Sequence, residues 1–198
     1  MATALKSTNF VAGWLGVLAV AVVIIAIIMS AATSGWIFGL NSISDLGVLA
    51  DGSLIFNAGV IVGGVLLLAY GAGRATYDEG LYGAGAICVA LAAIGIVMLA
   101  VFNLDVGSKY VHYLFAVWAA LFLATAMIVN SVQLFKDGGS RRIVAGVAIV
   151  VFVISIATFV VLTPAEWQTY TVFGALVWFI LDIAVYLASG LNTGKVDA

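Results

Sequence analysis

Charged residues are scarce in this chain. Its 198 residues include only seven Lys or Arg and nine Asp or Glu, whereas hydrophobic residues make up 65% and the mean hydropathy is +1.28. These values lie well outside the range of soluble globular domains. The composition therefore excludes a soluble globular domain and indicates a chain that lies in a membrane.

Cysteine, histidine and proline each occur once. A single cysteine, Cys88, excludes an internal disulfide and a cysteine-based metal cluster, and its place in an apolar run is typical of a small buried hydrophobic residue. A single histidine, His112, excludes a three-histidine zinc site. A metal would need mostly carboxylate ligands, which suit Mg²⁺, Ca²⁺ or Mn²⁺. We predict no metal site and no other cofactor. Pro164 interrupts no apolar run.

Six long apolar runs are separated by polar connections. About 20 apolar helical residues cross the hydrocarbon core, and lipid offers backbone groups no hydrogen-bonding partner, so each run predicts a helix. The first run is too long for a signal-peptide core and is interpreted as a retained helix. We predict an all-α bundle of six transmembrane helices in one membrane domain, residues 1–198. The predicted helices cover 10–32, 54–73, 80–101, 110–133, 142–162 and 165–189, with a long connection at 33–53.

Local patterns predict helix starts and close helix packing. Thr163-Pro164-Ala165-Glu166 is typical of a capping box with proline at the first helical position, and Thr76-Tyr77-Asp78-Glu79 repeats the pattern. Both patterns favour structural roles for Glu166 and Glu79. Gly59-x-x-x-Gly63 and Ala12-x-x-x-Gly16 are small-residue faces that let two helix backbones approach closely.

The basic residues predict the orientation of the chain. If six helices alternate, six of the seven basic residues fall on one side and only Lys109 falls on the other. By the positive-inside rule both chain ends are then cytoplasmic (N-in, C-in) in the cell membrane. The six basic residues on the cytoplasmic side are Lys6, Arg74, Lys136, Arg141, Arg142 and Lys195.

The net charge of −2 and the absence of a basic run predict no nucleic-acid partner.

The connection at 33–53 has room for a functional role because it is the longest in the chain. Its polar residues from Asn41 to Asp45 are flanked by apolar ones, a pattern that favours a segment tucked onto the helix bundle. Ser42 and Asp45 also have the spacing of a cap for a short interfacial helix, which is the structural alternative.

Further polar residues are predicted to meet near this connection, on the outer face. Asp105 ends the third helix, and His112 lies about one turn inside the fourth, shallow enough to meet water. A histidine beside carboxylates can act as a general acid or base, and a hydrogen-bonded structural histidine is the alternative. We predict catalytic roles for Asp45, Asp105 and His112, and binding roles for Ser44 and Asn57.

Asp182 is the only charged residue in the interior of a predicted helix, away from the helix ends. An intramembrane carboxylate needs a partner or a proton, so Asp182 is a candidate binding residue. The alternative is a structural ion pair or hydrogen bond that orients the last helix. The predicted partners are Arg141 or Arg142, with Asn130 and Gln133 as further possibilities.

The residues also resemble a known family. The string Ile43-Ser44-Asp45-Leu46-Gly47, then Ser53 to Gly59, Phe102 to Asp105 and His112 resemble the six-helix prokaryotic family of unknown function numbered nine-nine-eight, common in archaea. A more distant resemblance is to the Frag/DRAM/Sfk membrane proteins, which carry an Ile-Ser-Asp-x-Gly string. Ser44, Asp45 and His112 are also remotely similar to part of the zinc site of ceramidase-like hydrolases. The family resemblance implies six helices and no particular activity.

Three functions are compatible with these features. The first is a non-catalytic membrane protein: a scaffold, an accessory subunit or a lipid-binding module. The second is an enzyme that acts on lipid headgroups at the outer leaflet through Asp45, Asp105 and His112. The third is a small-solute or proton transporter that uses Asp182. Membrane lipid is the predicted partner, and the small-residue faces are also compatible with a membrane-protein partner or a homo-oligomer.

Overall fold

The computed structural model describes the backbone of residues 2–192 and the side chains of residues 10–188. Six of its helices are long and apolar enough to cross a membrane, and no strand occurs in the described part of the chain, which confirms the predicted all-α fold of six spanning helices. The helices are α1 (Ala2–Ser34), α2 (Ser53–Ala75), α3 (Gly80–Val101), α4 (Lys109–Asp137), α5 (Arg141–Val161) and α6 (Pro164–Asn192), with a short 3₁₀ helix, η1 (Ile43–Gly47), between α1 and α2.

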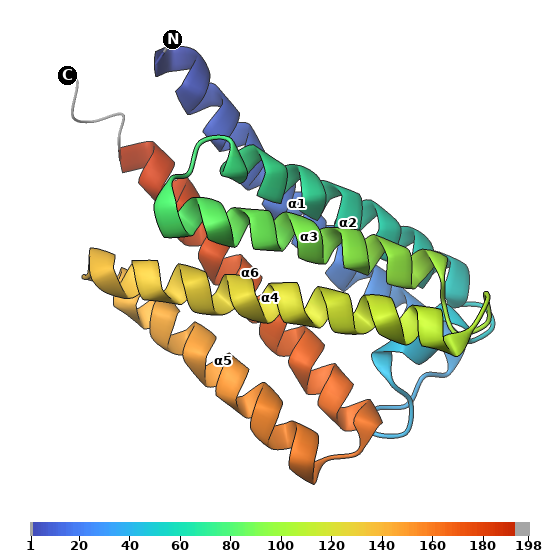
Figure 1. Cartoon of the computed structure of the whole chain (residues 1–198). Helices are drawn as coiled ribbons and strands as arrows, with labels where there is room; N and C mark the ends of the chain where they lie inside the picture. Colours follow the sequence, from blue (N-terminus) through green and yellow to red (C-terminus); the bar gives the residue numbers. More distant parts are fainter. Residues whose placement is uncertain (1, 193–198) are drawn as a thin grey trace.

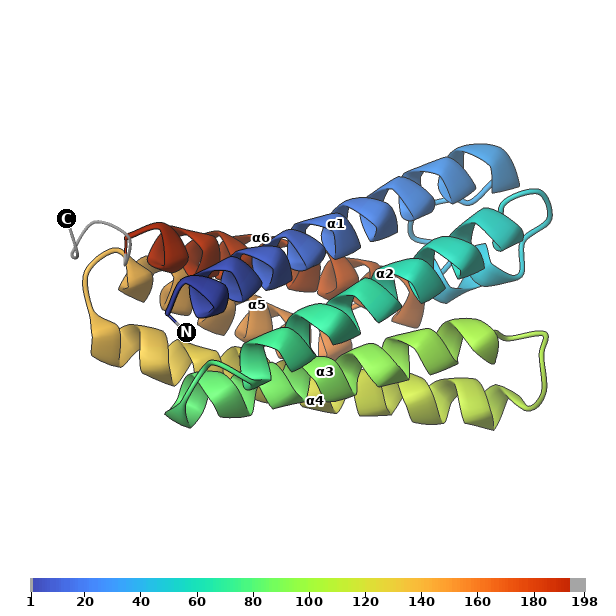
Figure 2. The same ribbon diagram turned by 90° about the horizontal axis from the view of Figure 1, so that it is seen from above.

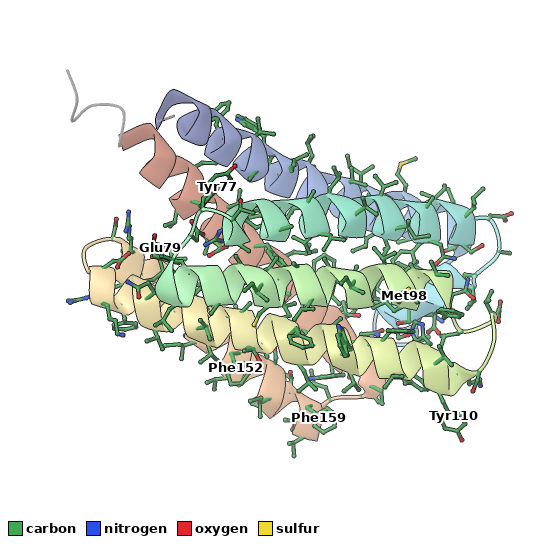
Figure 3. All side chains as sticks on the ribbon, turned by 45° about the horizontal axis from the view of Figure 1, so that its top comes forward. Tyr77, Glu79, Met98, Tyr110, Phe152 and Phe159 are labelled. Carbon is green, nitrogen blue, oxygen red and sulfur yellow. The ribbon has the colours of Figure 1, made fainter. Side chains whose placement is uncertain are left out.

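The helices run up and down in sequence order. Each of α1 to α4 packs against the next, α6 returns beside α1, and α5 bridges α4 and α6 (Figures 1 and 2). The start of α1 and the end of α6 lie at one end of the bundle, and the connection that contains η1 lies at the opposite end (Figure 1). We call these the Arg74 end and the η1 end. Carbon side chains cover the middle of the bundle, and oxygen and nitrogen atoms gather toward its two ends (Figure 3).

Glycines bring α2 close to two neighbours. A Cβ on Gly59 or Gly63 would collide with Ala26 or Val23 of α1, which agrees with the predicted packing role of this pair. On another face of α2, a Cβ on Gly71 would lie 2.7 Å from the backbone nitrogen of Ala90 in α3. The two glycine faces therefore set the spacing of α1, α2 and α3, because no side chain separates the backbones there.

Helix α5 leaves the bundle along much of its length. Its buried residues, Val144, Ala145 and Ala148, all lie near its start. Toward the η1 end α5 diverges from α4 (Figure 1). Its large side chains there are exposed, such as Phe159 at 65% and Val160 at 82%. Lipid is the natural surrounding for such an apolar surface in a spanning helix.

The two predicted capping boxes have different outcomes. At α6 the box forms, since the Glu166 carboxylate accepts from the Thr163 backbone N–H at 3.1 Å and the Thr163 hydroxyl accepts from the Glu166 N–H at 3.3 Å. At α3 the prediction is wrong. Glu79 is the residue that precedes the helix and makes no capping hydrogen bond with its side chain, and Asp78 instead pairs with Arg74 of α2. The Thr76 hydroxyl donates to the Gly73 carbonyl at 2.7 Å, so it belongs to the end of α2, and α3 begins only after Glu79.

A candidate lipid site with a serine–histidine pair

Two polar clusters lie inside the bundle, one toward each end. The first joins α2, α4 and α6 around Arg74 and Asp182. The second joins η1, α4 and α6 around Ser44 and His112, and a large cavity begins beside it.

Arg74 and Asp182 form a buried ion pair. The Arg74 Nη1 atom lies 2.6 Å from the Asp182 Oδ2 atom, and the side chains are 3% exposed. The Tyr70 hydroxyl donates to the same carboxylate oxygen at 3.0 Å, and the Asn130 side-chain amide donates to the other at 3.2 Å. Arg74 also donates to Asp78 through Nε at 2.8 Å. Each charge therefore has an opposite charge and further hydrogen bonds, as buried ions require.

Arg74 is the partner that the sequence analysis missed. Of the predicted partners of Asp182, only Asn130 contacts it, because Arg141 and Gln133 bind Asp137 instead. The sequence pattern groups Arg74 with the basic residues of the cytoplasmic side, but Arg74 lies in the last turn of α2 and is only 2% exposed. The spacing of Tyr70 and Arg74, which puts both on one helical face, is the signal that could have indicated it. An ion pair enclosed in this way favours the structural role for Asp182.

Ser44 and His112 are within hydrogen-bonding distance at the η1 end. The His112 Nε2 atom lies 3.2 Å from the Ser44 Oγ atom. The Nδ1 atom lies 3.0 Å from the backbone oxygen of Leu99 and 2.9 Å from that of Phe102. Carbonyl oxygens only accept hydrogen bonds, so Nδ1 carries the proton and donates to them. In the neutral ring, Nε2 is then an acceptor, and the Ser44 hydroxyl donates to it.

Gln168 holds Ser44 from the opposite side. The Gln168 Nε2 atom donates to the Ser44 Oγ atom at 2.8 Å, and the Ser44 backbone N–H donates to the Gln168 Oε1 atom at 3.1 Å. These two bonds fix η1 against α6 across 124 residues of sequence. Ser44 therefore sits between a hydrogen-bond donor on α6 and an acceptor on α4.

Two substitutions of His112 are predicted to differ in stability. His112→Leu leaves the Leu99 and Phe102 carbonyls at the end of α3 without their hydrogen-bond donor. This loss should lower the unfolding free energy of the protein by about 1–3 kcal/mol. His112→Asn places an amide N–H at the position of Nδ1 and should retain most of that stability. Thermal unfolding of the purified variants in detergent measures the difference. Equal loss in both variants would contradict the assigned role of Nδ1.

A cavity of about 510 Å³ extends from this cluster toward the middle of the bundle. This volume is typical of ligand pockets. Polar lining residues lie toward the η1 end, among them Ser42, Ser44, Asp45 and Gln168, and the remaining walls are almost wholly apolar. The apolar walls come from α1, α2, α3, α4 and α6 and include Val20, Val60, Ile96, Leu123 and Leu176.

The cavity opens sideways along α4. Tyr113 and Val117 line it, yet they are 54% and 56% exposed. No residue of α5 is among its lining, which agrees with the divergence of α5 from α4 at this end. An opening on the apolar flank of a spanning helix faces the layer that lipid chains occupy.

Residues 15–189 match the model of the family described as "Protein of unknown function (DUF998)". The chain belongs to this family. No curated protein and no solved structure matches it. The DUF998 match contains both polar clusters and the whole cavity lining.

The structure of this DUF998 protein brings some of the predicted site residues together. Ser44 and His112 touch, and Asp45 lies next to Ser44 in η1, where its carboxylate accepts from the Ser42 backbone N–H at 2.7 Å. That bond is the helix-start role foreseen as the structural alternative for Asp45. Asn57 donates from its side chain to the Gly47 carbonyl at 2.8 Å and so anchors η1 to α2.

Asp105 is not part of this cluster. It is exposed in the turn between α3 and α4, where its backbone N–H donates to the Asn103 side chain at 3.0 Å, and it is not among the residues that line the cavity. Gln168 takes a place in the cluster for which no role had been predicted. Among the described residues, no group of three His, Cys, Asp or Glu side chains is arranged to hold a metal ion.

Proposed function

We propose that this protein is a lipid-binding membrane protein that holds one acyl chain in the cavity beside α4. The observation that carries the proposal is a large apolar cavity with a sideways opening and polar atoms at one end only. That distribution of polarity matches an amphiphile whose chain lies in the cavity and whose first polar atoms reach Ser44 and Gln168.

The depth of the cavity fits one half of a bilayer. Along α6 its lining runs from Pro164 to Phe179, and the part that an acyl chain would occupy lies between Gln168 and Phe179. At 1.5 Å per residue this is about 16 Å, roughly half of the ~30 Å hydrocarbon core. A chain that enters sideways from one leaflet would therefore fill the cavity and end near Phe179.

The leaflet follows from the distribution of basic residues. Arg74, Lys136, Arg141 and Arg142 lie at the Arg74 end of the bundle, and Lys109 begins α4 at the η1 end. Lys195 lies outside the described residues. If the positive-inside rule holds, the η1 end faces outward. We therefore place the lipid in the outer leaflet of the cell membrane.

Photo-crosslinking in nanodiscs tests the proposal. The probe is a phosphatidylcholine with a diazirine in its palmitoyl chain, and adducts are mapped by mass spectrometry. Adducts are expected on the cavity residues of α4 and α6 more often than on the exposed flank of α5. Ala175→Phe fills the middle of the cavity and should reduce the cavity adducts at least about tenfold, because overlap with a bound chain removes its contacts.

Ala157→Phe is the matched control. Ala157 is exposed on α5 and is not among the cavity lining residues, so this substitution should leave the cavity adducts unchanged. Equal labelling of α5 and the cavity, or equal cavity labelling in Ala175→Phe and the wild type, would overturn the proposal, since either result describes ordinary surrounding lipid.

A further inference from the structure

We propose that Ser44 is a nucleophile and His112 its general base, and that together they cleave a carboxylic ester of the lipid held in the cavity. This inference rests on the proposed lipid site and adds a reaction to it. Its basis is the contact of three groups from η1, α4 and α6 at the polar end of the cavity.

The hydrogen bonds around His112 connect a serine, a base and a group that orients the base, which is the arrangement that activates a serine nucleophile. A serine nucleophile needs a base within hydrogen-bond reach, and the base needs a third group that fixes its ring. The Ser44 Oγ to His112 Nε2 distance of 3.2 Å meets the first requirement. The carbonyls of Leu99 and Phe102 meet the second, because they accept from Nδ1 and leave Nε2 free of a proton. The same carbonyls would stabilise the ring when it becomes positively charged.

Gln168 is placed to stabilise the charge that develops on the substrate. Its side-chain amide has two N–H groups, and one of them donates to the Ser44 Oγ atom. The second is available to an oxygen bonded to the carbon that Oγ attacks. A side-chain amide in this role is worth about 10²–10³ in rate in other hydrolases.

The position of Ser44 selects the kind of bond. Ser44 lines the cavity where polar residues begin, and the apolar walls extend away from it. An acyl chain that fills the apolar part would bring its first polar group, the ester carbonyl, to Ser44. The ring of His112 is only 2% exposed and its Nε2 atom lies 3.2 Å from the Ser44 Oγ atom, so the base lies beside the serine at the polar end of the cavity.

The reaction balances without a metal or redox partner. Ser44 Oγ attacks the ester carbonyl carbon, and its proton passes to His112 Nε2. The tetrahedral intermediate collapses with cleavage of the carbon–oxygen ester bond, and the leaving alcohol takes the proton from Nε2. Water then attacks the acyl-serine, gives one proton to Nε2, and releases the fatty acid as the proton returns to Ser44 Oγ.

A fluorophosphonate probe tests the activated serine directly, because the serine oxygen displaces fluoride from phosphorus. Folded protein in nanodiscs should be labelled at Ser44, and heat-unfolded protein should not. Ser44→Ala should lose the label. His112→Asn keeps the donor to Leu99 and Phe102 but lacks Nε2, so its labelling rate should fall about 10²-fold or more. Thr158→Val removes a hydroxyl of α5 that is not among the cavity lining residues, so this variant should label like the wild type.

Hydrolysis of 4-nitrophenyl palmitate completes the test. The wild type should release nitrophenol at least about 100-fold faster than Ser44→Ala or His112→Asn. The inference is overturned if the wild type is not labelled or if Ser44→Ala hydrolyses the ester equally well. Cavity crosslinking without serine labelling would leave the lipid site intact and remove the reaction. Ser44 labelling without cavity crosslinking would remove the acyl-chain site, and with it the substrate assigned here.

Discussion

Arg74→Met is expected to lower the unfolding free energy by about 3–5 kcal/mol, since it leaves Asp182 charged and buried without its cation. Asp182 is 3% exposed, and its Oδ2 atom receives hydrogen bonds from Arg74 and Tyr70. The remaining donors, Tyr70 and Asn130, are neutral and cannot replace a guanidinium. For a chain of this size the midpoint of thermal unfolding should fall by roughly 10 °C. Size-exclusion chromatography after heating the detergent-solubilised protein measures this shift.

Two further variants separate the ion pair from a general loss of charge. Arg142→Gln removes an exposed arginine at the same end of the bundle and should change the unfolding free energy by no more than about 0.5 kcal/mol. The double variant Arg74→Met/Asp182→Leu removes both buried charges and should be more stable than Arg74→Met alone. If Arg74→Met unfolds like Arg142→Gln, the pair contributes nothing to stability and its structural role is wrong.

Gly71→Ala is expected to destabilise the protein by about 1–3 kcal/mol through one added methyl group. The new Cβ would lie 2.7 Å from the backbone nitrogen of Ala90 and 3.0 Å from the backbone oxygen of Ala86. Backbone atoms of a helix cannot rotate aside as a side chain can, so α2 and α3 must separate. The separation also disturbs Tyr70 and Arg74, which flank Gly71 on α2.

Gly146→Ala is the matched control for this substitution. Gly146 also lies inside a spanning helix, α5, and a Cβ there would meet no atom within 4 Å. This variant should be as stable as the wild type or more stable by up to about 1 kcal/mol, because alanine favours a helix. Parallel thermal unfolding of both alanine variants provides the comparison. A similar loss in both would indicate that helix glycines act through flexibility and not through close packing.

The sequence by itself determined the class and the number of helices. Each apolar run must form a helix because lipid leaves backbone groups no other partner, and this constraint acts on each run alone. A local capping signal was also reliable where its two side chains flank the actual start of a helix. The box formed by Thr163 and Glu166 is such a case. The box predicted at Glu79 did not form because the Thr76 hydroxyl bonds to the end of α2 and α3 begins only after Glu79.

The tertiary structure alone decided how the polar residues pair and where the cavity lies. Ser44 meets His112 across 68 residues and Gln168 across 124, and Asp182 meets Arg74 across 108. These pairs depend on which side of each helix faces the core. In helices that are apolar on nearly all sides, the sequence gives little indication of that side. The opening along α4 arises because α5 diverges from it, an angle that depends on packing against both neighbours at once. Helix formation is thus a local property that can be predicted from the sequence, whereas the site is formed by contacts among helices.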